Sequence, residues 1–414
     1  MITPAYSATA TERVLPRMAL DFTTASLDAR VTVTRALNTA TRVNSSGFLE
    51  TVNANLPRFD FDPISLTCKG LLIEELRTNV ILNSSDFSNG ATWTPTNLNT
   101  SGTPAWINVG VAPDGASTAD KLIADSTSGS HLVGTLVTPV VDTYTASAYV
   151  KAAGYGFCAL QMLFGGLNIF RAYNLTTGAI TASAGTGTDA TPVNAGNGWW
   201  RFAVTFTTLS TATDAFRVRV ENAGTGANWS GNGTDGILVW GAQLEAGSFP
   251  TSYIPTTTTS LTRNADVVSM TGTNFNDWWT STIGAAVARV LPSTVSGTRP
   301  AAQFDDNSAN NIIALRGNTT NPELYIRATT DQAQIDAGTI SANTTYLLGG
   351  AWNTNDCAAA VNGGTAVPDT SVTVPTATQA RLGSDGTNYL NGCLQSLRYW
   401  PQRVTNAEIQ AFSK

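Results

Sequence analysis

The sequence predicts an all-β protein: an irregular N-terminal segment, two β-sandwich domains of the jelly-roll type, and one short C-terminal helix. Three observations predict it. Charged residues make up only 13% of the 414 residues, against about 25% in a typical soluble protein. Gly, Thr, Ser, Asn and Ala are abundant instead, and this mixture favours short strands and polar turns over helices. Short alternating segments recur between turn signals, as in a sandwich.

The first predicted region, residues 1–80, is irregular and carries the densest charge. Arginines alternate there with aspartates and glutamates, and few stretches keep a strand or helix period. Such a segment buries little surface by itself. We therefore expect it to fold against the rest of the chain, a sister subunit or a larger assembly.

The second predicted region, residues 81–255, consists of many short strands. Thr143–Lys151, Trp200–Phe206 and Phe216–Glu221 alternate between apolar and polar residues, and Ile237–Trp240 is an apolar run typical of a fully buried strand. These features predict a jelly roll. Proline and threonine dominate the following stretch, which predicts a semi-rigid linker at residues 256–262.

The third predicted region, residues 263–414, is a second sandwich. Its expected strands are Asn311–Arg316, Glu323–Ala328, Tyr346–Trp352, Cys357–Val361, Gln379–Leu382 and Gln395–Trp400. Asn362-Gly363-Gly364 predicts a tight turn. Only Thr405–Ser413 has helical spacing, and Thr405 or Asn406 can cap that helix.

Composition also limits the partners and the compartment. The net charge of −6 gives no electrostatic footprint for nucleic acid. Apolar runs long enough to cross a membrane are absent from the sequence, and the N-terminus lacks the apolar core of a signal peptide. We therefore expect no membrane insertion, and synthesis in the cytoplasm without an export signal.

Four cysteines lie far apart in the sequence, without a C-x-x-C pair, so a zinc or redox site is not expected. We interpret them as buried thiols. A disulfide between Cys357 and Cys393 stays open as an alternative, because both fall in one predicted sheet.

The chain lacks a recognisable catalytic centre. His131 is the only histidine, and no motif surrounds it, so a structural role is favoured over catalysis. We expect no enzyme activity and no cofactor. Asp305 and Asp306 are a weak calcium candidate because Ca²⁺ prefers oxygen ligands, and a solvated turn is the favoured alternative.

Tryptophans set among Asn, Thr and Gly are the candidate glycan contacts. An exposed aromatic face beside polar groups is what stacking on a sugar ring requires. Packing in a core is the favoured interpretation for each tryptophan taken singly, and the expectation of glycan contact rests on the collection. The candidates are Trp93, Trp106, Trp229 and Trp279.

Two segments resemble tailed-bacteriophage virion proteins of the tail-fibre, minor-tail or head-fibre type. The first has the pattern P-R-F-D-x-D-P followed by G-L-L-I-E and R-T-N, and it spans Pro57–Asn79. The second contains W-G-A-Q-L-E and F-P-T-S-Y-I-P-T, followed by T-R and A-D, and it spans Trp240–Asp266. The resemblance implies a carbohydrate-binding-module-like jelly roll between the segments and a laminin-G- or concanavalin-like domain after them.

The resemblance also implies a location and partners. We expect a structural protein on the surface of the phage particle, mounted by its N-terminus and contacting host-surface polysaccharide through its sandwiches. Homotrimers and neighbouring virion proteins are the expected partners. The alternatives are a capsid decoration, head-fibre or baseplate protein without a receptor role, a capsular polysaccharide depolymerase, and a bacterial surface adhesin.

Charged and apolar residues of the first segment are the candidate attachment site. Arginine forks bind carboxylates in a fixed geometry, and an adjacent apolar run can anchor the contact. The residues expected to act in assembly are Arg58, Asp60, Asp62, Leu71, Leu72, Ile73, Glu74 and Arg77.

Overall fold

The structure is a computed structural model that describes residues 15–101, 106–208 and 214–414. Strands dominate, and the helices among these residues are η1 (Phe22–Thr24), α1 (Thr273–Asn276) and α2 (Asn406–Phe412). The predicted all-β fold and C-terminal helix are confirmed. No helix in these ranges is both long and apolar enough to span a membrane.

The chain packs as two compact units. Unit 1 comprises the described residues up to Val33, Gly70–Ile73 and Val267–Lys414, and unit 2 comprises Thr34–Lys69 and Glu74–Asp266. This division differs from the predicted regions, because residues of the first 80 contribute to both units. Their short strands find hydrogen-bond partners far away in the sequence.

Unit 1 contains two antiparallel sheets. In the first, the strand order is β31 (Val367–Asp369), β30 (Cys357–Val361), β29 (Tyr346–Trp352), β24 (Gly284–Pro292), β33 (Gly392–Trp400) and β6 (Cys68–Ile73). In the second, it is β2 (Thr32–Thr34), β23 (Val267–Thr271), β32 (Gln379–Leu382), β25 (Thr298–Asp305), β26 (Asn311–Asn318), β27 (Asn321–Ala328) and β28 (Thr330–Asp336). Each strand predicted for the third region lies in one of these sheets.

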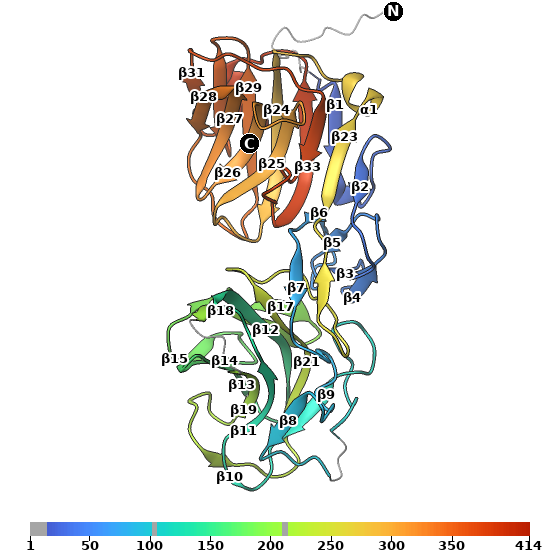
Figure 1. Cartoon of the computed structure of the whole chain (residues 1–414), viewed down its shortest axis with the longest axis vertical. Helices are drawn as coiled ribbons and strands as arrows, with labels where there is room; N and C mark the ends of the chain where they lie inside the picture. Colours follow the sequence, from blue (N-terminus) through green and yellow to red (C-terminus); the bar gives the residue numbers. More distant parts are fainter. Residues whose placement is uncertain (1–14, 102–105, 209–213) are drawn as a thin grey trace, which may run out of the picture. The chain divides into compact units, whose positions relative to one another are not determined.

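Two N-terminal strands complete the first sheet of unit 1. β1 (Met18–Asp21) pairs with the end of β33, from Met18 opposite Tyr399 to Asp21 opposite Ser396, and the two strands lie side by side in Figure 1. β6 pairs with the start of β33, from Gly392 opposite Ile73 to Leu394 opposite Leu71. The predicted apolar anchor Leu71, Leu72 and Ile73 is therefore buried in this sheet of its own chain.

The C-terminal helix packs on the outer face of the same sheet. Thr405 caps α2 in a capping box with Glu408, an arrangement that satisfies two backbone donors at the helix start. Ile409 is buried in a cluster with Trp400, and Phe412 stacks on Trp400 at a ring distance of 4.6 Å. The i, i+3 apolar pair of the sequence thus covers the sheet.

Unit 2 is a sandwich of two further antiparallel sheets. One has the order β15 (Ile180–Ala184), β14 (Leu167–Asn174), β13 (Phe157–Phe164), β19 (Asp214–Glu221), β11 (His131–Val137) and β8 (Trp93–Thr96). The other has the order β16 (Thr188–Asp189), β18 (Trp199–Thr208), β12 (Asp142–Ala153), β21 (Gly236–Ala246) and β9 (Asp120–Ile123), with β17 (Val193–Gly196) beside β18.

Smaller pairings complete unit 2. They are β3 (Ala40–Val43) with β4 (Leu49–Val52), β7 (Arg77–Asn79) with β22 (Leu261–Arg263), and β10 (Ser128–Gly129) with β20 (Trp229–Ser230). β5 (Phe59–Phe61) is a further short strand of unit 2. Inside the sandwich, alternation decides the packing. Phe216, Val218 and Val220 of β19 belong to the core, as their spacing predicts.

Asparagine supplies much of the turn chemistry. Among the described non-glycine residues with positive φ, ten of sixteen are Asn, and Asn tolerates this left-handed conformation better than most residues. Asn362 and Gly363, which have φ of 49° and 72°, form the predicted turn between β30 and β31. The high Asn and Gly content therefore has a local structural cause.

The strand order decides whether Cys357 and Cys393 can form a disulfide. Cys357 lies on β30 and Cys393 on β33, and both are buried. Two strands, β29 and β24, separate them, which places them about 14 Å apart at ~4.8 Å per strand. A disulfide requires Cα atoms within about 7 Å, so the Cys357–Cys393 bridge is wrong.

An isoleucine pair tests the place of β6 in the sheet. Ile73 is fully buried, whereas Ile64 is 62% exposed. We expect Ile73→Ala to lower the free energy of unfolding by about 2–5 kcal/mol and Ile64→Ala to change it by less than about 0.5 kcal/mol. Urea denaturation followed by tryptophan fluorescence measures both, and equal effects would contradict the assignment.

Candidate functional site

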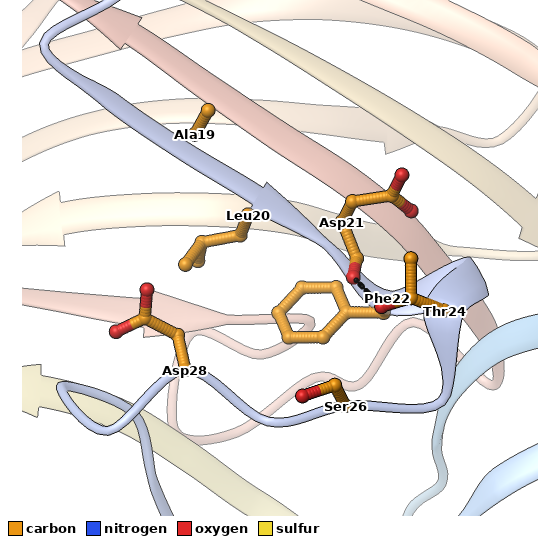
Figure 2. A pocket seen from close by; sticks show the side chains of 7 residues that line it. All are labelled: Ala19, Leu20, Asp21, Phe22, Thr24, Ser26 and Asp28. Atoms are coloured by element: carbon orange, nitrogen blue, oxygen red, sulfur yellow. Dashed lines mark hydrogen bonds between the residues drawn. The ribbon is translucent and has the colours of Figure 1, made fainter.

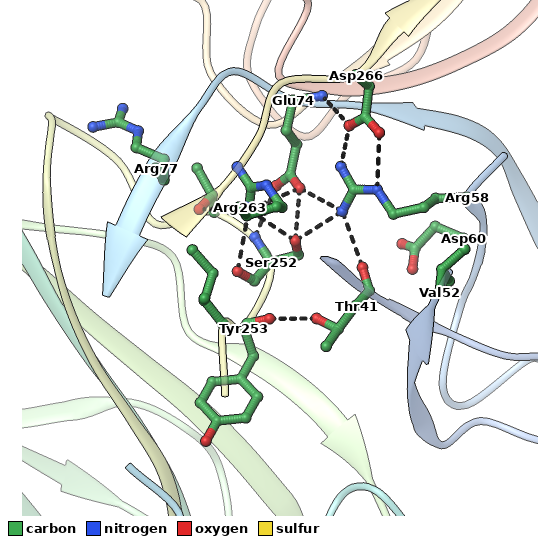
Figure 3. A network of polar contacts seen from close by, with 12 residues as sticks. Thr41, Val52, Arg58, Asp60, Glu74, Arg77, Ser252, Tyr253, Arg263 and Asp266 are labelled. Atoms are coloured by element: carbon green, nitrogen blue, oxygen red, sulfur yellow. Dashed lines mark hydrogen bonds and ion pairs between the residues drawn. The ribbon is translucent and has the colours of Figure 1, made fainter. Parts of the chain in front are cut away.

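Arg58 lies at the centre of a buried group of charges in unit 2 (Figure 3). Its side chain is fully buried and forms ion pairs with Asp266 and, at 2.7 Å, with Glu74. The guanidinium also donates to Ser252 Oγ and to the backbone oxygen of Thr41, each at 2.9 Å. A single planar cation thus joins four separate segments of the chain.

Two more arginines share the same carboxylates. Arg263 Nη1 lies 3.2 Å from Glu74 Oε2, and Arg35 Nη1 lies 2.8 Å from Asp266 Oδ1. Asp266 Oδ2 also accepts from the backbone N–H of Glu74 at 3.0 Å. Each carboxylate therefore binds two guanidinium groups. These five residues, Arg35, Arg58, Glu74, Arg263 and Asp266, are called the charge cluster below.

The charge cluster lies where the chain leaves unit 2. Glu74 is the first residue after the unit 1 segment that ends at Ile73, and Asp266 is the last residue before the unit 1 segment that begins at Val267. Arg35 is the second residue after Val33, where another unit 1 segment ends. The cluster therefore fixes, inside unit 2, the backbone at three of the four points where the chain passes between units.

Ion pairing keeps Arg58 and Glu74 charged despite their burial. Burial opposes the charge of Arg58, but Asp266 and Glu74 outweigh it and raise the pKa of the guanidinium. Burial would raise the pKa of Glu74, but the charges of Arg263 and Arg58 and the hydrogen bonds from Ser252 lower this pKa to about 2. Opposite charges at close range favour the ionised forms, so the pairs persist at neutral pH.

Polar residues around the cluster form hydrogen bonds between the two segments that resemble phage virion proteins. Asn79 is fully buried; its Nδ2 donates to the backbone oxygens of Ala242 (3.1 Å) and Ile254 (2.9 Å), and its Oδ1 accepts from the N–H of Leu244 at 3.1 Å. Thr41 Oγ1 donates to the backbone oxygen of Tyr253 at 2.5 Å. One asparagine thus bridges two stretches that are about 165 residues away in the sequence.

Arg77 makes a second set of contacts with the later segment. Its guanidinium lies over the ring of Phe249 at 4.8 Å and pairs with Glu75 at 2.5 Å. A Cβ at Gly247 would lie 1.4 Å from Arg77 Nη1. A larger residue at position 247 would displace the arginine from this place, and the φ of 130° at Gly247 also favours glycine.

The predicted attachment residues therefore divide into different roles. Arg58 and Glu74 meet in the charge cluster, and Arg77 contacts the later segment. Asp60 instead pairs with Lys69 at 2.5 Å, and Asp62 Oδ1 accepts backbone N–H groups within its own turn. Arg58 and Glu74 are buried in their own chain, where their described partners are residues of unit 2.

Sequence reasoning missed four members of this network as site residues: Arg35, Ser252, Arg263 and Asp266. A signal was available for three of them, because Ser252, Arg263 and Asp266 all lie in the second segment of the resemblance. That resemblance implied a common fold without naming contacts between the segments. Ser252 carries no chemical signature apart from its hydroxyl.

Three of the candidate glycan tryptophans are core residues. Trp93 is 1% exposed and packs against Phe87 and Phe216. Trp106 and Trp279 are each 8% exposed. Trp279 follows the short helix α1, so the inward and outward alternation of a strand does not apply to it. The prediction of exposed, ring-stacking faces is wrong for these three residues.

Trp229 is the candidate that keeps partial exposure. Its ring contacts the ring of Tyr155 at 4.7 Å and that of His131 at 4.3 Å. The two ring nitrogens of His131 lie 2.6 and 3.0 Å from the backbone oxygens of Asn97 and Trp229. His131 is fully buried and ties the loops that carry these oxygens, which favours the structural role expected of it.

The candidate calcium residues have partners within the chain. Asp305 is buried, and its Oδ2 lies 2.9 Å from both Arg381 Nε and Gln303 Nε2. Asp306 accepts from Asn311 and from the hydroxyl of Ser308. Within the described ranges, no group of three or more His, Cys, Asp or Glu side chains is placed to hold a metal ion.

A small pocket of about 180 Å³ lies along β1 and η1 in unit 1 (Figure 2). Asp21 Oδ1 accepts from the N–H and hydroxyl of Thr23 at 2.9 and 2.6 Å. The carboxylate of Asp28 pairs with Arg30 at 2.7 Å. Both acids of this pocket thus already serve local turns of the chain.

A larger pocket, of about 350 Å³, lies among loops of unit 2. It is called the loop pocket below. Its lining residues are Leu98, Asn99, Thr100, Ser101, Asp125, Ser126, Asn232 and Gly233. Trp229 precedes Asn232 on the same loop, so the remaining half-exposed glycan candidate lies on a segment that forms this pocket.

No protein-family model matches the sequence, and no curated protein matches it. Solved structures with similar folds include the CBM40 of Ruminococcus gnavus IT-sialidase, at a TM-score of 0.28 and 8% identity, covering 32% of this chain and 83% of that one. Domain 4 of AbnA, a GH43 extracellular arabinanase from Geobacillus stearothermophilus in complex with arabinotriose, gives 0.29 and 16%, covering 36% and 73%. The heptameric SAP-like pentraxin of Limulus polyphemus gives 0.26 and 15%, covering 32% and 70%.

Removal of the central arginine tests the charge cluster. Arg58→Met leaves Glu74 and Asp266 buried with fewer partners, so we expect a loss of about 3–5 kcal/mol in the free energy of unfolding. Arg30→Met is the matched control, because Arg30 pairs with Asp28 at the surface and such pairs contribute about 0–1 kcal/mol. Guanidinium chloride denaturation measures both. Similar losses would contradict a special role for Arg58.

The cluster also predicts a dependence on pH. The folded-state pKa of Glu74, about 2, lies below its ordinary value of 4.5, so its ionised form stabilises the fold above pH 4.5. This contribution, roughly 3 kcal/mol, is lost as the pH falls toward 2. We expect the difference in unfolding free energy between the parent protein and Glu74→Gln to shrink between pH 5 and pH 2.5. A constant difference over this range would contradict the prediction.

Proposed function

We propose that this protein is a structural component of a tailed-phage particle, of the tail-fibre or spike type, that contacts glycans of the host surface through its β-sandwiches. One observation carries the virion part. The two segments that resemble phage virion proteins, Pro57–Asn79 and Trp240–Asp266, interlock around the charge cluster. Matching residues such as Arg58, Glu74 and Asp266 are in direct contact.

This interlocking supports the resemblance because it gives the shared residue types a common physical purpose. A pattern of arginines and acids that met no partners would carry less weight. Here each charge of the pattern in the cluster has an opposite charge within about 3 Å. The two segments therefore form one interlocked unit, and this supports the proposal that the chain is related to the phage proteins that it resembles.

A binding role is proposed in preference to catalysis. The only histidine, His131, has both ring nitrogens beside backbone oxygens and is buried, so it offers no free nitrogen to a substrate. The acids of the charge cluster are paired with arginines. These contacts favour a structural, ligand-binding protein over a depolymerase.

The partners follow from the same proposal. The chain would form homotrimers and meet a neighbouring virion protein, as fibres of this type do. Because Arg58, Glu74 and the apolar anchor are buried within the chain, we expect assembly to use exposed groups of the N-terminal segment as well. Five apolar side chains there are about half exposed: Leu37, Leu56, Ile64, Leu66 and Leu76.

Location and oligomeric state test the proposal. We expect antibodies against the purified chain to label tailed particles produced from the genome that encodes it, at fibres or spikes visible by electron microscopy. Sedimentation equilibrium of the purified chain should give about three times the 43.4 kDa chain mass. Particles without label would overturn the virion role. Label on the capsid would instead support a decoration protein or head fibre.

A further inference from the structure

We propose that the loop pocket of unit 2 binds one neutral sugar residue at the end of a glycan. This inference rests on the proposed glycan-binding role and gives it a site and a ligand class. The pocket volume of about 350 Å³ lies at the small end of the usual 300–1,000 Å³ range for ligand sites. A single sugar ring, with part of its neighbour, suits this volume better than a long chain.

Hydrogen bonds to backbone oxygens hold the walls of the loop pocket in place. The N–H of Gly233 donates to Ala124 O at 2.9 Å, and Asn99 Nδ2 donates to Gly233 O at 3.0 Å. The N–H of Asp125 donates to Asn97 O at 3.1 Å. Three separate loops are therefore linked to one another, and a site built this way loses little freedom when a ligand binds.

Several hydrogen-bonding groups of the pocket remain available to a ligand. Asp125 Oδ1 accepts from the N–H of Thr127 at 2.8 Å, whereas its Oδ2 has no hydrogen-bond partner among the described residues. The hydroxyls of Thr100, Ser101 and Ser126 likewise have none there. The carboxylate oxygen can accept from sugar hydroxyls, and the three hydroxyls can both accept from and donate to them.

The charge of the pocket selects among sugars. None of its lining residues is Arg or Lys, and Asp125 is the charged member. A carboxylate accepts strong hydrogen bonds from neutral hydroxyl groups. It repels the carboxylate of a sialic or uronic acid, because like charges at close range are unfavourable. The pocket therefore favours hexoses and N-acetylhexosamines over acidic sugars.

An apolar contact completes the site. Leu98 is partly buried, packs against the core of unit 2 and also lines the pocket. Its side chain can meet the C–H face of a sugar ring. Trp229 lies three residues before Asn232 of the lining, and its ring packs on Tyr155 and His131. Leu98 then supplies the apolar surface that the tryptophans were expected to supply.

Saturation-transfer NMR and calorimetry on the full chain test the site. The probes are methyl galactoside, methyl glucoside and N-acetylglucosamine as neutral sugars, and sialyllactose and glucuronic acid as acidic ones. We expect at least one neutral sugar to bind more tightly than both acidic ones. Asp125→Asn keeps the Oδ1 acceptor for Thr127 but replaces the free oxygen, and it should weaken binding about tenfold or more.

Asp142→Asn is the matched control. Asp142 is exposed and its Oδ1 accepts from the next backbone N–H at 2.7 Å, as Asp125 Oδ1 accepts from Thr127. It lies at the far end of β12 from Ala153, which pairs with Gly236 near the pocket, about 35 Å away at ~3.3 Å per residue. Binding by this variant should equal that of the parent. Ser126→Ala removes one hydroxyl without altering charge and should weaken binding severalfold.

Three results would overturn the inference: no binding of any neutral sugar, tighter binding of an acidic sugar, or unchanged binding by both Asp125→Asn and Ser126→Ala. Each variant is first checked for an unaltered denaturation midpoint. If sugars fail to bind while antibodies label the particle, the site is wrong and the virion role stands. If sugars bind but particles carry no label, the site stands and the virion role is wrong.

Discussion

The guanidinium of Arg58, shared between Glu74 and Asp266, is the interaction on which the rest of unit 2 depends. It is fully buried, and it joins residues more than 200 positions away from one another in the sequence. Burying an ion costs several kcal/mol unless partners surround it. Here Arg35, Arg263 and Ser252 complete the surroundings, so the cost is offset only when distant segments meet correctly.

This constraint concerns geometry more than net stability. In other proteins, a buried ion pair replaced by apolar residues of similar size is often neutral or stabilising. Apolar side chains, however, can shift along one another with little loss of contact. A guanidinium group bound by two carboxylates cannot, because its hydrogen bonds fix the geometry. We infer that the charge cluster is retained because it sets where the chain leaves unit 2. Three of those exits lie at or within two residues of Arg35, Glu74 and Asp266.

Local patterns predicted much of the fold. Alternation identified the inward residues of β19, turn residues marked the end of β30, and the spacing of Ile409 and Phe412 identified α2. The pairing of β1 and β6 with β33 was not predictable. The alternation within a short strand indicates which face is buried but not which strand pairs with it. Trp93 and Trp279 were misjudged for a related reason: polar neighbours in sequence do not make a ring exposed in space. The ion pairs of the charge cluster could not be predicted either, because composition does not indicate which arginine contacts which acid.

The pairing of Met18–Asp21 with Ser396–Tyr399 has a consequence for synthesis on the ribosome. Unit 2 has all its residues once Asp266 has emerged, so it can fold while the chain is still growing. Unit 1 must wait for β33, and until then β1 has no neighbour for its backbone groups. Domains fold as units during synthesis at about 5–20 residues per second, which leaves the early strand exposed for roughly 20–80 seconds. A chaperone that shields extended, apolar N-terminal segments would therefore act on unit 1 and leave unit 2 to fold alone.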